Sequence, residues 1–130
     1  MGTTLVALVS IVLLVATMPA VAHHSFAAEF DADKPITLTG TVTRLAWANP
    51  HVWFYLDVKD EAGSVANWAM EMGSPNGLMR EGWTRHSMTI GGVVTVEGFR
   101  AKNGSNVGNA RVVILTGTGQ RLFAVSSRGN

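Results

Sequence analysis

A repeat of two residues runs through most of the chain after Ile36, and it restricts the fold more than any other feature of the sequence. In ITLTGTVTRL, a threonine stands at every second position and alternates with Ile36, Leu38, Gly40 and Val42. This pattern is typical of a strand that buries one face, and a glycine on that face indicates a bend or a close backbone approach. Similar alternation predicts further strands in VWFYLDV, VANWAMEM, VVTVEGFR and NARVVILTG, and RLFAV can add a short last one.

One segment departs from this alternation and predicts a short helix. In GSPNGLMREGW, Ser74 can cap a helix, Pro75 suits its first position and Gly82 suits its end. The helix falls between the third and fourth predicted strands, and the second and third strands are expected to form a hairpin. This order predicts an all-β fold with one short helix, a five-stranded OB-like Greek-key barrel.

The first 22 residues have the features of a secretory signal peptide. An apolar run from Leu5 to Val15 is followed by Pro19 and by a small-x-small triplet that ends at Ala22. Cleavage there makes His23 the first residue of a periplasmic or otherwise exported protein, and an uncleaved membrane anchor is the alternative. The predicted organisation is a signal peptide at 1–22, an N-terminal arm at 23–35, the barrel at 36–125 and a disordered tail at 126–130.

Composition excludes several classes of function. The 130 residues carry ten Lys/Arg and nine Asp/Glu, a formal net charge of +1 without a basic run, so nucleic acid is not an expected partner. There is no cysteine, so a metal site would have to use His, Met, carboxylate or backbone groups. No nucleophile elbow, phosphate loop or zinc-protease helix motif is present, and the expected function is binding rather than catalysis.

The leading candidate for a site is the pair of histidines at the predicted mature terminus. The amine and the imidazole of His23 can chelate one metal ion, and His24 and His51 can add imidazoles in the planar arrangement that copper(II) prefers. Glu29 and Asp31 can supply oxygen ligands, which leaves zinc and nickel open as well. The other interpretation is that the terminal histidines form a solvated tail and that His51 only makes a hydrogen bond in its turn.

Several motifs resemble those of an exported bacterial family of unknown function whose members begin HHSF directly after the signal peptide. The matching segments here are HHSFAAEFD, LTGTV, NPHVWFYLDV, NW, EMGSP, GW, VVTVEGFRAKNGS, GNAR and LFA. They are spread over most of the predicted mature chain. The resemblance implies export and a small β-domain, and it implies no particular activity.

A second set of possible metal ligands lies on the third predicted strand. Trp68, Met70 and Met72 share one face because they are spaced two residues apart, and Glu71 faces the other side. Together with His51 they resemble the site of small periplasmic copper and silver chaperones, which are OB barrels that use one His, one Trp and two Met. The alternative is that the indole and the thioethers fill the core of the barrel.

Three aromatic residues form the remaining candidate site. Trp53 and Tyr55 lie on the face of their strand opposite Val52 and Phe54, and Trp47 precedes the same strand. Such a surface can bind an envelope protein, unless other parts of the chain cover it. The sequence therefore predicts an exported periplasmic binding module that holds copper, with a metal-free protein-interaction or envelope-assembly module as the alternative.

Overall fold

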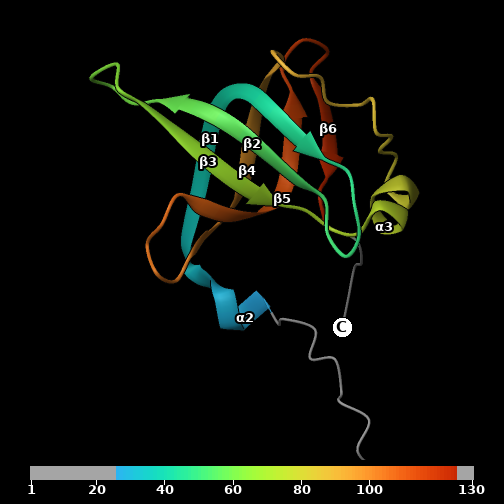
Figure 1. The fold of residues 1–130 in the computed structure, drawn as a ribbon, viewed down its shortest axis with the longest axis horizontal. Coiled ribbons are helices and arrows are strands. Elements are labelled where there is room, and N and C mark those ends of the chain that lie inside the picture. The colour runs from blue at the N-terminus through green and yellow to red at the C-terminus, as the bar shows by residue number, and fades with distance from the viewer. Residues whose placement is uncertain (1–25, 126–130) are drawn as a thin grey trace, which may run out of the picture.

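The computed structural model describes residues 26–125, and this part of the chain forms a strongly curved β-sheet that closes on itself (Figure 1). The predicted signal peptide and the predicted tail lie outside the described residues. In chain order the elements are α2 (Phe26–Glu29), β1 (Phe30–Ala46), β2 (Trp53–Lys59), β3 (Val65–Glu71), α3 (Pro75–Arg80), β4 (Val93–Ala101), β5 (Val107–Leu115) and β6 (Gln120–Phe123).

The pairing of the strands is that of an OB-type barrel. Antiparallel pairing joins β3, β2, β1, β4 and β5 in that order, and a short parallel pairing of β3 with β5 closes the ring. The predicted all-β, OB-like fold is confirmed, including the β2–β3 hairpin and the short helix between the third and fourth strands. The four-residue helix α2 precedes the barrel and was not predicted.

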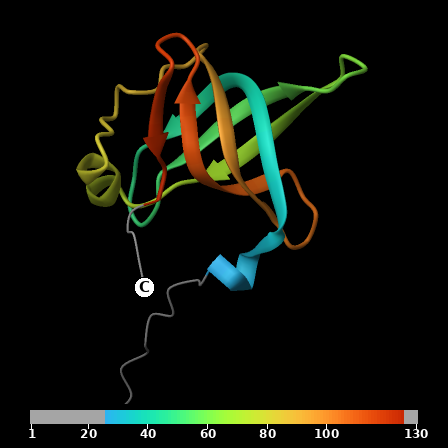
Figure 2. The same cartoon turned by 180° about the vertical axis from the view of Figure 1, so that it is seen from behind.

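A sixth strand extends the sheet beyond the ring. β6 pairs with the last part of β5, Val112–Leu115, whereas β3 pairs with its first part, Val107–Asn109. Figure 2 shows β4, β5 and β6 side by side from behind the barrel. The short last strand that RLFAV indicated is therefore present, and it lies on the edge of β5 that β3 leaves open.

β1 begins at Phe30, earlier than the predicted start at Ile36. Phe30 is buried and pairs with Ala101 of β4, and regular pairing resumes at Pro35. The residues between them, DADK, lack apolar alternation, so the sequence indicated an arm at this position. The structure joins the end of that arm to the sheet through a single buried aromatic ring and an irregular pairing.

The glycine on the inward face of β1 permits a close approach of two strands. A Cβ atom added to Gly40 would overlap the carbonyl oxygen of Asp57 on β2, so only glycine fits there without movement. Farther along β1, a register shift between Val42 and Arg44 reverses the alternation of the two faces. After this bulge the odd-numbered residues point inward, and Leu45 is accordingly half-buried and pairs with Phe54.

Helix α3 forms as its sequence predicts. The Ser74 hydroxyl accepts a hydrogen bond from the Gly77 N–H at 3.2 Å, Pro75 occupies the first turn, and Gly82 adopts a positive φ of 95° just beyond the last turn. Leu78 is fully buried, so the helix covers part of the barrel interior. After the helix, the indole N–H of Trp83 donates to the carbonyl oxygen of Phe123 at 2.7 Å and links this segment to β6.

The barrel interior is filled by apolar side chains from every strand of the ring. The fully buried members of this core include Phe54, Leu56, Met70, Val96 and Val113. Close packing of this kind is the main stabilising contribution for a small domain without disulfides. None of the helices in residues 26–125 has the length and apolar character needed to cross a bilayer.

Candidate functional site

The tryptophan and the two methionines that the sequence marks as alternative metal ligands lie on the inward face of β3 and, for Met72, directly after its end. Met70 and Met72 are 0% and 2% exposed, and Trp68 is 8% exposed. All three belong to the hydrophobic core cluster, and the Arg100 guanidinium covers the Trp68 ring at 5.1 Å from its centroid. The thioethers therefore contact other core side chains instead of solvent, which favours packing over copper(I) binding as their role.

The outward face of β3 carries Glu71, which lies beside His51. Oε1 of Glu71 is 3.2 Å from Nδ1 of His51. The hairpin register brings them together, because Glu71 pairs with Trp53 and His51 lies two residues before Trp53, on the same side of the chain. The His51 side chain is 38% exposed and that of Glu71 is 12% exposed, so solvent reaches this pair from the imidazole side.

The spacing of these two donor atoms suits a shared metal ion. Imidazole nitrogens and carboxylate oxygens bind zinc-like ions at about 2.0–2.2 Å, so two donors on one ion lie roughly 3 Å apart. The observed 3.2 Å agrees with this separation. Glu71 was not predicted as a ligand from the sequence. The hairpin register is the signal that could have found it.

Trp53 forms one wall of a pocket of about 350 Å³ next to this pair. Glu29 at the end of α2 and Lys102 at the start of the β4–β5 turn also line it. The backbone N–H of Lys102 donates to the carbonyl oxygen of Glu29 at 2.9 Å, so α2 and the turn are joined there. The predicted oxygen ligand Glu29 thus lines the same pocket as Trp53. Trp53 follows His51 by two residues in the chain.

Aromatic contacts hold α2 against the barrel. The Phe26 ring stacks on Phe30 with centroids 5.7 Å apart and meets Phe99 edge-on at 5.6 Å. The Arg111 guanidinium lies 4.7 Å from the Phe26 centroid and 5.4 Å from that of Phe99. Glu71 pairs with Asn109 on β5, and Arg111 lies two residues after Asn109. The first described residue is therefore anchored near the His51–Glu71 pair.

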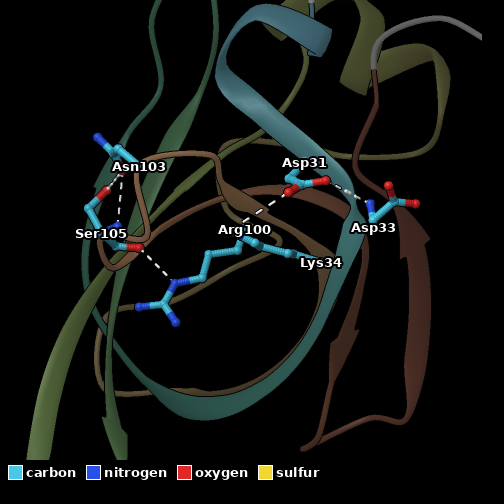
Figure 3. Close-up of polar contacts among 6 residues, drawn as sticks. All are labelled: Asp31, Asp33, Lys34, Arg100, Asn103 and Ser105. Carbon is cyan, nitrogen blue, oxygen red and sulfur yellow. Dashed lines mark hydrogen bonds and ion pairs between the residues drawn. The ribbon is translucent and has the colours of Figure 1, made fainter.

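Asp31, the other predicted oxygen ligand, makes local contacts at the start of β1. Its carboxylate accepts a hydrogen bond from the Asp33 N–H at 2.9 Å and lies 3.7 Å from the Lys34 ammonium. Figure 3 shows this carboxylate directed at Asp33 and Lys34, while the Arg100 guanidinium reaches the turn that contains Asn103 and Ser105. The structure does not bring Asp31 to the His51–Glu71 pair.

Two of the predicted metal ligands, His23 and His24, lie outside the described residues. Within residues 26–125, no three His, Asp or Glu side chains gather closely enough to hold a metal ion by themselves. The described part of the predicted site is therefore His51, with Glu71 added by the structure and Glu29 lining the pocket beside Trp53.

The three aromatic residues of the predicted interaction surface are divided between two places. Trp53 and Tyr55 are half-buried on the outward face of β2, and the Arg44 guanidinium lies 4.7 Å from the Tyr55 ring centroid. Trp47 packs against the core and lines a different pocket, near α3. The bulge in β1 explains this division, because it turns the odd-numbered residues after Val42 toward the interior. Trp53 and Tyr55 alone share a surface.

These features define a class of protein: a small OB-type β-barrel whose N-terminal segment packs beside an outward-facing His–Glu pair and a tryptophan-walled pocket. The chain belongs to DUF6152, a family of unknown function, whose model matches residues 10–110. No curated protein shows significant sequence similarity to it. The predicted membership of an uncharacterised family is thereby confirmed.

Proposed function

We propose that this protein is exported, that its mature chain begins at His23, and that it serves in the periplasm as a binding module for one copper ion. His23 contributes its amine and its imidazole, and His24 and His51 contribute further imidazoles. Glu71 supplies an oxygen ligand or orients His51 through the contact between their side chains. Glu29, which lines the pocket beside Trp53, is a second oxygen ligand in this proposal.

The observation that carries this proposal is the 3.2 Å contact between Nδ1 of His51 and Oε1 of Glu71 beside the anchored start of the described chain. It supplies two donors at a separation that one ion can bridge. His24 precedes Phe26 by two residues, and a chain of that length spans at most about 7 Å. Anchoring of Phe26 beside Arg111 supports the ligand role proposed for His24.

The test is a titration of copper(II) into protein whose first residue is His23, with affinity measured by competition against a chelator of known strength. One added residue before His23 removes the terminal amine from the chelate and should weaken binding by about tenfold or more. His51→Ala should weaken it as well, whereas His86→Ala should not, because His86 is exposed in the segment between α3 and β4. Equal affinities for all four proteins would exclude the proposed ligands.

The metal-free alternative is a protein-interaction module that uses the outward face of β2. The half-buried Trp53 and Tyr55 favour it, since aromatic side chains on a sheet face are common anchors for partner proteins. Pull-down from envelope extracts with the natural chain and with Trp53→Ala tests this surface. A partner that both proteins retain equally would argue against it.

A further inference from the structure

The pocket beside Trp53 has a lining of which the proposed copper site uses only Glu29. Its apolar lining includes Phe30, Ala101 and Val107, of which the first two are buried. The Trp53 indole forms a wall, and it remains partly exposed although it lies on a strand of the barrel. A partly exposed indole among apolar lining residues offers a surface for the apolar face of a ligand.

Polar groups from the β4–β5 turn, residues 102–106, stand on the rim of this pocket. Lys102, Asn103 and Ser105 all line it and are exposed. Oδ1 of Asn103 accepts hydrogen bonds from the N–H and the hydroxyl of Ser105, at 3.0 and 2.6 Å. The Asn103 amide N–H groups and the Lys102 ammonium make no hydrogen bond or ion pair with any described residue. The rim therefore presents unused donors, and the Ser105 hydroxyl oxygen keeps lone pairs that can accept.

The rim is held in place before any ligand arrives. Arg100 donates from Nε to the carbonyl oxygen of Ser105 at 3.0 Å and from Nη2 to Oδ1 of Asn106 at 3.2 Å (Figure 3 shows the first of these). The Gly104 N–H donates to the carbonyl oxygen of Ala101 at 3.0 Å, and the Lys102 N–H is bound to Glu29. A turn fixed by this many contacts loses little conformational entropy when it binds a small molecule.

We infer that this pocket binds a saccharide unit, with the sugar ring stacked on Trp53 and its hydroxyl groups bonded to Lys102, Asn103 and Ser105. A sugar has an apolar C–H face together with a rim of hydroxyls that both donate and accept, and this pocket offers the matching arrangement. Its volume of about 350 Å³ is at the lower end of the range for small-ligand pockets, which suits one or two rings. Oligosaccharide binding is also compatible with the OB architecture, which uses the loop between its fourth and fifth strands for such ligands.

Other ligand classes fit this lining less well. A nucleotide would need several cations for its phosphates, and Lys102 is the one basic residue among those that line the pocket. An alkyl chain would leave the polar rim without partners, at a cost in free energy. The saccharide assignment does not depend on copper, and the two can be tested separately.

The test is an NMR titration of the isotope-labelled mature chain with chitobiose in the presence of EDTA. The indole N–H signal of Trp53 and the amide signals of Asn103 and Ser105 should shift together and saturate. Trp53→Ala should weaken binding by about tenfold, whereas Tyr55→Ala, on the same face but outside the pocket, should leave it unchanged.

Lys102→Ala provides a second variant, because this side chain is exposed and makes no hydrogen bond or ion pair with any residue of 26–125. It should weaken chitobiose binding by a smaller factor, about twofold to fivefold. The inference is overturned if chitobiose shifts none of these signals, or if Trp53→Ala and Lys102→Ala bind as the natural chain does. A saturable shift with adenosine monophosphate but not with chitobiose would also overturn it.

Discussion

Both faces of β3 carry residues that could bind a metal ion. The residues on one face are buried in the core, and those on the other face lie toward solvent. Trp68, Met70 and Met72 point inward and are almost completely removed from solvent. Glu71, between the two methionines in sequence, points outward and contacts the half-exposed His51. One strand thus supplies the core with its even-numbered residues and a candidate site with an odd-numbered one. The comparison shows that strand phase, more than residue type, decides which potential ligands can meet a metal ion.

Substitution on the inward face should have the largest effect on stability. Met70→Ala leaves a cavity at a fully buried position and should lower the free energy of unfolding by about 2–5 kcal/mol, measured by urea denaturation. Met70→Leu keeps the volume and should cost less than about 1.5 kcal/mol. Neither variant should change copper affinity at temperatures where it is folded. A folded Met70→Leu protein that no longer bound copper would show that the metal site is on the inward face of β3 and not on the outward face.

Substitution at the anchor of the outward site should affect metal binding more than stability. Phe26→Ala removes the ring that packs on Phe30, Phe99 and Arg111, and under the proposed function this ring is the anchor from which the terminal histidines reach the metal ion. Copper affinity should fall by about tenfold, and the free energy of unfolding by roughly 0.5–1.5 kcal/mol.

Phe123→Ala is the matched control for this variant, because Phe123 is 48% exposed on β6. It should keep the copper affinity of the natural chain. Natural affinity in Phe26→Ala as well would mean that the anchor does not position the ligands, although copper binding itself would stand.

The smallest effect is expected at an outward ion pair away from the candidate site. Arg121 donates two hydrogen bonds to Glu97, at 3.0 and 3.1 Å, and these bonds hold the pKa of the Glu97 carboxyl below its ordinary value. Because the folded-state pKa is the lower one, the stabilisation is complete above the unfolded-state pKa and disappears as the pH falls through the folded-state value.

Glu97→Gln should therefore be slightly less stable than the natural chain at neutral pH, and the two should converge in acid. Urea midpoints measured across this pH range provide the check, and added salt should reduce the difference because both groups are exposed. A difference that stayed constant with pH would assign the effect to packing instead of charge.

Much of the fold could be predicted because local patterns and tertiary structure agree. Alternation located the five strands of the ring, and the Ser74–Pro75 signal located α3. The start of β1 was missed because a single buried ring, Phe30, anchors a polar stretch without alternation. Such an anchor depends on Ala101, which is distant in sequence.

The candidate site was harder to predict, since it depends on relationships between strands. The contact of His51 with Glu71 follows from the register of the β2–β3 hairpin, which a single strand pattern does not fix. Trp47 was grouped with Trp53 because the bulge after Val42 leaves no clear signal in the sequence. The candidate ligands could be named from the sequence, because it shows their residue types. Which of these ligands lie in contact depends on how the strands pair.

The most direct test of the proposed copper site is native mass spectrometry of untagged protein recovered from the periplasm after growth with copper. The expected result is a mass that begins at His23 and includes one copper ion. A mass that begins at His23 without metal, even after copper is added to the purified protein, would contradict the proposal and leave the outward face of β2 as the functional surface.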